Sequence, residues 1–291
     1  MKTAQGLVEW AKEAYANGWV YWWGTCGYKC TTSLLNSKTN QYPSHYTSKR
    51  RATYEKHIAE GRVAADCIGL FKSYAWDKDD DIDTVDGKYG SNEHPDKSTK
   101  QALAACKVKG DIATVPEIPG LAVWTKSAGH IGVYVGNGEV IELKGYSDNC
   151  QWNKLADRTF TTWGLYPYVE YTAEQVAMAK AAASAKVLRK GDRGEEVKQM
   201  QEALLRAGYD LGKYGADGIF GSETLSAVRA YQHDHGLTPD GIAGPLTLAA
   251  LRDVEPDEPK EDEDDQEEQG LTLEQRVERL EKTVFGGESN G

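Results

Sequence analysis

The sequence predicts an α+β fold over residues 1–171, followed by a small three-helix bundle over residues 186–252. Apolar residues alternate over 130–135 and 139–144 on either side of an Asn-Gly turn, which is a strong short-range signal for an antiparallel hairpin. Apolar residues at helical spacing over 6–17 predict a first helix. The first unit is therefore expected to combine helices with an antiparallel sheet.

The second unit contains a repeated turn-and-helix pattern. The segment 217–225 (Asp-Gly-Ile-Phe-Gly-Ser-Glu-Thr-Leu) returns as 240–248 (Asp-Gly-Ile-Ala-Gly-Pro-Leu-Thr-Leu), and each copy places a tight Asp-Gly turn before a helix start. Another helix is predicted after Gly194, where apolar residues follow the i, i+3, i+4 and i+7 spacing. Residues 172–185 are rich in alanine and are expected to form a helical or loosely ordered linker.

The charge of the chain is concentrated at its C-terminal end. The 291 residues include 34 Lys or Arg and 45 Asp or Glu, for a net charge of −11. Residues 253–291 hold 4 basic and 15 acidic side chains, so they carry the whole imbalance and the remaining body is neutral. A neutral body offers no large basic face, so no nucleic-acid partner is expected.

Two segments make up this acidic end. Residues 253–270 are predicted to be an acidic, disordered spacer, because so charged a run cannot bury apolar surface. Residues 271–291 are predicted to form a short helix and a tail, with apolar residues at 4-3-4 spacing from Leu273 to Val284. Two interpretations stay open: a frayed helix in solvent, or a weak homo-oligomer formed through residues 271–285.

Membrane segments and cofactor motifs are not evident in the sequence. No apolar run approaches the roughly 20 residues that span a bilayer, so no membrane insertion is expected. The N-terminus does not resemble a signal peptide, which predicts synthesis in the cytoplasm. Five cysteines, an odd number, argue against a full disulfide framework. Cys26 and Cys30 have no matching His or Cys pair nearby, so neither a metal nor another cofactor is expected.

Cys67 lies at the predicted start of a second helix, over residues 66–76. Backbone N–H groups and the positive end of the helix dipole favour a thiolate at such a position. Asp66 is expected to cap the helix, and Gly69 to let another element approach closely. On this segment alone, two interpretations are open: a catalytic nucleophile or a buried structural cysteine.

His130 and Glu142 are predicted on the two strands of the hairpin. With the turn centred at Asn137, Gly132 faces Glu142. The side chains of His130 and Glu142 then emerge on the same face as diagonal neighbours. A base held by a carboxylate, and packed against a cysteine at a helix start, is the arrangement of a nucleophile, a base and an orienting group.

These segments resemble the NlpC-type cysteine peptidases of bacterial cell walls. The resemblance is carried by Tyr21-Trp22-Trp23-Gly24, Asp66-Cys67-Ile68-Gly69-Leu70, residues 119–124 (Pro-Gly-Leu-Ala-Val-Trp) and residues 129–138 (Gly-His-Ile-Gly-Val-Tyr-Val-Gly-Asn-Gly). It implies a papain-like catalytic domain with a central antiparallel sheet and the cysteine at the N-terminus of a helix. Members of this family cleave the stem peptides of peptidoglycan.

The resemblance also implies roles for individual residues. Cys67 is the expected nucleophile, His130 the base and Glu142 the orienting residue. The residues expected to bind substrate in this domain are Tyr21, Trp23 and Asp66. Two positions depart from the family: Leu121 stands where Asp is usual, and a Glu as the third catalytic residue is closer to the related CHAP amidases and endopeptidases.

Residues 186–251 resemble the small peptidoglycan-binding domain found beside many wall hydrolases. Most of its glycines and apolar residues are expected to be structural, and Asp217, Phe220 and Tyr231 are the expected contacts with sugar or peptide. A second unit that binds the wall suits an insoluble substrate, because tethering raises the local concentration of the catalytic unit.

Together the resemblances imply an endolysin-like peptidoglycan hydrolase that acts on the cell wall after release or export. The first expectation is an endopeptidase that cleaves a γ-D-glutamyl–diamino acid bond. The alternatives are an N-acetylmuramoyl-L-alanine amidase and a cross-bridge endopeptidase. From another class, a catalytically inactive wall-binding protein is the further alternative.

Overall fold

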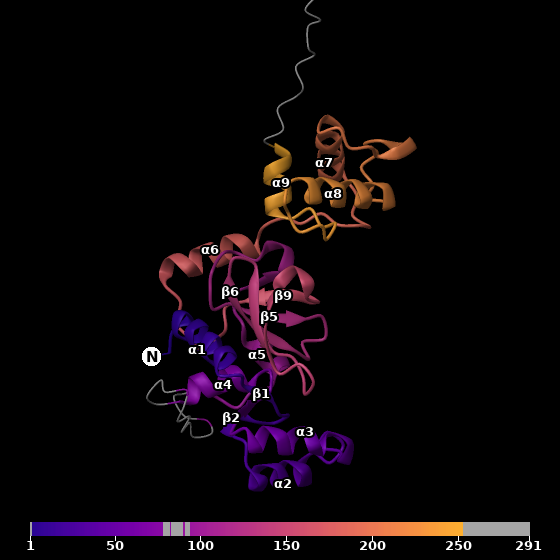
Figure 1. The fold of residues 1–291 in the computed structure, drawn as a ribbon. Helices are drawn as coiled ribbons and strands as arrows, with labels where there is room; N and C mark the ends of the chain where they lie inside the picture. The colour runs from indigo at the N-terminus through magenta and orange to yellow at the C-terminus, as the bar shows by residue number, and fades with distance from the viewer. Residues whose placement is uncertain (1, 78–81, 83–89, 91–93, 253–291) are drawn as a thin grey trace, which may run out of the picture.

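The computed structural model describes residues 2–77, 82, 90 and 94–252, and these form a mixed α+β structure (Figure 1). A six-stranded antiparallel sheet has the strand order β4-β9-β5-β6-β7-β8. The α+β prediction with an antiparallel sheet is therefore confirmed. The strands are β4 (Lys109–Asp111), β5 (Ala122–Thr125), β6 (Ile131–Gly136), β7 (Glu139–Leu143), β8 (Cys150–Lys154) and β9 (Phe160–Gly164).

A smaller sheet leads into the segment that holds Cys67. It has the order β1-β3-β2, with β1 (Val20–Tyr21) parallel to β3 (Val63–Ala65) and β2 (Cys26–Lys29) antiparallel to it. Helices α2 (Thr32–Gln41) and α3 (Ser48–Ala59) connect β2 with β3 and lie together at one end of the molecule in Figure 1. Because β3 ends at Ala65, the smaller sheet fixes the position of the next residues.

Helix α1 (Ala4–Ala16) packs against β6, β7 and β8 of the large sheet and against α4 (Gly69–Trp76). The side chain of Thr3 caps it by accepting a hydrogen bond from the Gly6 amide at 3.1 Å. This cap explains why the helix begins two residues before the predicted start. Its buried Trp10 donates to Ser73 Oγ at 2.9 Å, which ties α1 to α4.

The predicted linker over 172–185 is an ordered helix rather than a loose connection. Helix α6 (Ala173–Ala183) begins with a capping box between Thr172 and Gln175 and packs against β4. Ala179 is fully buried there beside residues of the large sheet. The described residues of the first unit also include α5 (Thr99–Ala105) and short 3-10 turns at η2 (Ile112–Thr114) and η3 (Leu155–Asp157). A further 3-10 turn in the second unit is η4 (Gly212–Tyr214).

The β6–β7 hairpin has the predicted register. Val133 pairs with Ile141 and Tyr134 with Val140, which is the alignment in which Gly132 faces Glu142. Asn137 and Gly138 both have positive φ, at 53° and 69°, as a tight Asn-Gly hairpin turn requires. The first paired residue is Ile131, so His130 lies immediately before the strand rather than within it.

The second unit contains α7 (Glu195–Arg206), α8 (Ser222–Asp234) and α9 (Pro245–Arg252), around a core separate from that of the first unit. The two Asp-Gly turns are held by two buried glutamines. Gln201 Oε1 accepts from the Gly218 amide at 2.7 Å, and Gln232 Oε1 accepts from the Gly241 amide at 2.8 Å. Each glutamine also donates to the aspartate of its turn, at 3.1 and 2.9 Å, so the sequence repeat is also a structural repeat.

The predicted acidic spacer over 253–270 and the helix and tail over 271–291 lie outside the described residues. Among residues 2–252 that are described, no helix is both long and apolar enough to cross a membrane.

Candidate active site

Cys67 lies in a tight turn between β3 and α4, and Asp66 holds this turn in place. Asp66 Oδ1 accepts from the Gly69 amide at 2.7 Å, and its carbonyl accepts from the Leu70 amide at 3.1 Å, so Asp66 caps the helix as predicted. Its other carboxylate oxygen accepts from the Gly24 amide at 2.9 Å. A Cβ at Gly69 would lie 2.0 Å from the Thr25 carbonyl, so only glycine fits this close approach.

Burial of Cys67 opposes the thiolate that a helix start favours. The side chain is 5% exposed, and burial, followed by the charge of Asp66, raises the pKa of the thiol to about 12. The backbone amides of Ile131, Ile68 and Cys67 itself lower this pKa but do not outweigh the burial. The resting thiol is therefore protonated at neutral pH and needs a base to become a nucleophile.

His130 is hydrogen bonded to Glu142 across the hairpin. The distance between His130 Nε2 and Glu142 Oε2 is 2.5 Å. The His130 ring stacks on Phe160, with centroids 5.9 Å apart and an interplanar angle of 19°. The amide that contacts the Cys67 thiol belongs to Ile131, the residue directly after His130. The structure therefore places the Cys67 thiol beside the residue that follows His130, and His130 beside Glu142.

Two further residues hold Glu142, and the sequence reasoning missed both. Arg158 donates through Nε to Glu142 Oε1 and through Nη2 to Oε2 at 2.9 Å, and Asn153 Nδ2 donates to Oε1 at 3.1 Å. Glu142 is 0% exposed. Burial raises its pKa, but the hydrogen bonds from His130 and Arg158 outweigh this effect, so the pKa lies below its usual value.

A cavity of about 490 Å³ opens beside Cys67. Trp23 is 42% exposed and lines it, as does Asp66, so these two predicted substrate-binding residues lie at the cavity. Tyr21 does not line it: the side chain is 6% exposed. Burial, followed by the neighbouring Cys67 thiol, raises the pKa of Tyr21 above its usual range. Tyr21 is thus buried near Cys67 rather than at the cavity that Trp23 and Asp66 line.

The predicted contacts of the second unit are also revised. Phe220 is 1% and Tyr231 0% exposed, and both belong to the core of the three helices. Their side chains have no surface on which to contact a ligand. Asp217 is accessible, but its Oδ1 accepts hydrogen bonds from the Ile219 amide at 2.8 Å and from Gln201, so the structure gives it a role in the turn.

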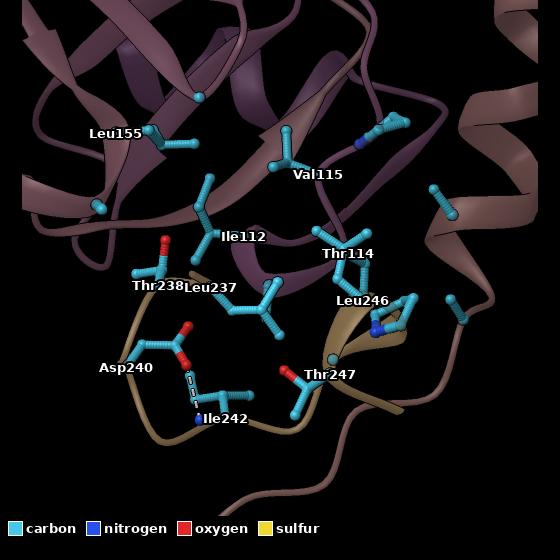
Figure 2. A pocket seen from close by; sticks show the side chains of 18 of the residues that line it. Ile112, Thr114, Val115, Leu155, Leu237, Thr238, Asp240, Ile242, Leu246 and Thr247 are labelled. Carbon is cyan, nitrogen blue, oxygen red and sulfur yellow. Dashed lines mark hydrogen bonds between the residues drawn. The ribbon is translucent and has the colours of Figure 1, made fainter. Parts of the chain in front are cut away.

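A larger cavity of about 750 Å³ lies between the two units (Figure 2). Ile112, Val115 and Leu155 of the first unit face Leu237 and Leu246 of the second across it. Beside the cavity, Arg189 Nη2 and Asp111 Oδ2 form an ion pair at 2.7 Å between the units. Its lining also includes Arg158 and Phe160, so it reaches the residues behind His130 and Glu142.

The sequence predicts neither a metal site nor a full disulfide framework. In the described part of the chain, no three His, Cys, Asp or Glu side chains gather in a way that holds a metal ion. All five cysteines are free and buried.

The family match to known proteins lies in the second unit. Residues 193–251 match the family described as a putative peptidoglycan binding domain. Two Bacillus licheniformis proteins are similar over short segments: N-acetylmuramoyl-L-alanine amidase CwlL, 49% identical over 65 residues, and a probable N-acetylmuramoyl-L-alanine amidase, 45% identical over 75 residues. These segments are 22% and 26% of this chain and 18% and 21% of the relatives, so the chain spans about a fifth of the curated relatives that it matches.

One solved structure with a similar segment is the crystal structure of Burkholderia AP3 phage endolysin. It is 46% identical, with a TM-score of 0.22, over 25% of this chain and 27% of that chain. The family match at residues 193–251 does not include Cys67, His130 or Glu142. Any catalytic role of the first unit must therefore be inferred from the arrangement of its own residues.

Proposed function

We propose that this protein is an endolysin-like peptidoglycan hydrolase whose first unit is a papain-like, NlpC-type cysteine peptidase that cleaves a stem-peptide amide. The observation that supports the proposal is that the Cys67 thiol contacts the amide of Ile131, the residue directly after the His130 that is hydrogen bonded to Glu142. A protonated, buried thiol beside a carboxylate-held imidazole is suited to general-base activation.

The proposed reaction proceeds through an acyl-enzyme. Glu142 accepts a hydrogen bond from Nε2–H of His130, which leaves Nδ1 to take the proton of Cys67. The sulfur attacks the amide carbonyl carbon, and the Cys67 amide stabilises the oxyanion. The C–N bond then breaks as His130 returns the proton to the leaving amine. Water, deprotonated by His130, attacks the thioester and releases the carboxylic acid and the free thiol.

The second unit is proposed to bind peptidoglycan and to tether the first unit to the wall. The match over residues 193–251 supports this role. Its predicted contact residues do not, because Phe220 and Tyr231 lie in the core, so the binding surface is carried by other residues. Tethering to an insoluble polymer raises the effective concentration of the catalytic cleft at its substrate.

The bond that we favour is the γ-D-glutamyl–diamino acid bond. The alternative is the N-acetylmuramoyl-L-alanine amide, because two relatives of the chain are named as amidases that cleave it. A cross-bridge endopeptidase uses the same three catalytic residues. An inactive wall-binding protein is disfavoured, because a protein without catalytic activity would not need a buried Glu142 hydrogen bonded to His130.

Fragment analysis with matched cysteine variants tests the proposal. Purified walls are digested, and the released fragments are identified by mass spectrometry, which assigns the bond that is cut. Cys67→Ala is expected to abolish release while wall sedimentation with the protein is unchanged. Cys30→Ala is the control, because this cysteine is equally buried but belongs to the separate cluster around α2 and α3. Fragment release by Cys67→Ala overturns the mechanism.

A further inference from the structure

We propose that Arg158 is a positioning residue of the catalytic site, which keeps Glu142 ionised and fixed so that His130 can accept the proton of Cys67. This inference rests on the proposed function, and it adds a residue that acts through Glu142 rather than on the substrate. Arg158 lies between η3 and β9, 16 residues after Glu142 in the sequence.

The first support is the saturation of the Glu142 carboxylate. Its two oxygens accept from His130, from Asn153 and twice from Arg158. A carboxylate that is removed from water stays ionised only where charged or polar donors replace its hydration. The planar guanidinium supplies two parallel donors, which fix the carboxylate plane as well as its charge. The orientation of the oxygen that faces His130 is therefore set from behind by Arg158.

The second support is the charge balance around His130. The groups that face Glu142 are His130, Arg158 and the Cys150 thiol on β8. Lys144, opposite His130 in the hairpin register, is paired with Asp148 at 3.5 Å. Arg158 thus supplies the positive charge that directly neutralises Glu142. Without it, the buried Glu142 carboxylate would lose the charge that favours its ionised form, and the pKa of this carboxyl group would rise.

The third support is the packing of Arg158. Its guanidinium lies over the Phe160 ring at 6.0 Å, and the same ring stacks on His130. The Arg158 side chain is 19% exposed at the wall of the cavity between the units. One aromatic ring therefore supports both the base and the residue that positions its partner.

The pH profile of kcat/KM separates this role from a merely structural one. The substrate is a soluble muropeptide that carries the bond cleaved by the wild type. In Arg158→Met the acidic limb is expected to move to higher pH by about one unit or more, because the variant lacks the positive charge that favours the ionised Glu142 carboxylate. On this limb, activity then falls about tenfold for each unit of displacement, and it recovers towards the wild-type value in alkaline solution.

Arg158→Lys keeps the positive charge but loses the two parallel guanidinium donors. Its acidic limb should therefore stay in place while kcat falls. Arg51→Met removes an arginine that is paired with a carboxylate at the surface, Glu55 on α3, and is expected to leave the profile unchanged. An Arg158→Met enzyme that loses activity equally at every pH, or loses none, overturns the inference. If that variant does not fold, a displaced acidic limb in Arg158→Lys overturns it instead.

The failure of this inference is distinguishable from the failure of the proposed function. If Cys67→Ala still cleaves the muropeptide, the cysteine mechanism is wrong. If Cys67→Ala is inactive but the Arg158 variants keep the wild-type profile, the mechanism stands and only the positioning role is wrong.

Discussion

Replacing Gly132 by alanine tests whether the hairpin itself holds the His130–Glu142 pair in place. Gly132 faces Glu142 in the register of β6 and β7. A Cβ at this position would lie 2.7 Å from Val140 Cγ2, 3.2 Å from Phe160 Cζ and 3.4 Å from Glu142 Cβ. The first distance is too short for two carbon atoms, so Val140, Phe160 or the strand must move.

The magnitude follows from overpacking a core that is already full. Adding a methyl group to such a site costs about 1–3 kcal/mol. In a unit of this size that lowers the melting temperature by roughly 2–4 °C per kcal/mol. Because Phe160 stacks on His130, the same shift also disturbs the base. We therefore expect kcat/KM to fall about tenfold, from misplacement of the catalytic pair.

Thermal unfolding and muropeptide cleavage measure the two effects, and Gly145→Ala is the matched control. Gly145 follows the same hairpin, but an added Cβ there has no atom within 4 Å. Its melting temperature and activity should be unchanged or slightly raised. A Gly132→Ala protein with wild-type stability and activity would refute the reasoning that this glycine is required by space at the catalytic pair.

Two further predictions concern the buried carboxylate and the buried amides. The folded state lowers the pKa of Glu142, so the ionised carboxylate stabilises the fold at pH values above its ordinary pKa of 4.5. This stabilisation is lost as the pH falls through the folded-state pKa. The stability of Glu142→Gln should therefore depend less steeply on pH below about 4.5. Gln201→Ala and Gln232→Ala should each destabilise the second unit by roughly 1–3 kcal/mol, because buried turn groups lose their partners. Hydrogen exchange measures the latter effect, since the unit has no tryptophan to report it by fluorescence, and equal protection in variant and wild type would contradict it.

The hairpin and the helix cap were predictable because their signals are local. Asn137-Gly138 determines the turn, and the turn determines the register that places Glu142 diagonally from His130. Asp66 caps the helix three residues before Gly69, a spacing that is visible in the sequence. Each of these features is determined by residues that lie close together in the sequence.

The thiol and the arginine were not predictable for the opposite reason. The high pKa of Cys67 follows from burial among β3, α4 and β6, and a helix start in isolation suggests the reverse. Arg158 contacts Glu142 only because β9 lies in the same sheet and the chain turns back before it. An arginine in a polar loop carries no sequence signal for that contact.

Aromatic residues beside turns misled the sequence reasoning in the second unit. Phe220 and Tyr231 stand where a surface contact is plausible, but a unit of this size needs large side chains to fill its core. The buried glutamines were equally hidden, because Gln201 lies 16 residues before its aspartate and Gln232 only 8. The turn segments repeat in sequence, whereas the residues that hold them do not repeat at one spacing.

The placement of the two units predicts that binding and cleavage are separable. The second unit lies at the end of the molecule near β4 and α6, away from α2 and α3 (Figure 1), and the cavity beside Cys67 is lined only by residues of the first unit. The direct polar link between the units, Arg189–Asp111, is partly exposed, and such pairs contribute about 0–1 kcal/mol. A fragment that ends at Ala185 keeps α6, the sheet and the cavity beside Cys67 intact.

This fragment should cleave a soluble muropeptide with the wild-type kcat/KM but sediment poorly with purified walls. Its solubility is expected to fall, because truncation uncovers the apolar residues Ile112, Val115 and Leu155. Removal of residues 253–291 alone is the matched control and should change neither activity nor wall binding. Full wall binding by the 1–185 fragment would show that the first unit attaches to the wall by itself. A fragment that folds but does not cleave the soluble muropeptide would show that the second unit supports the catalytic residues through the cavity that reaches Arg158.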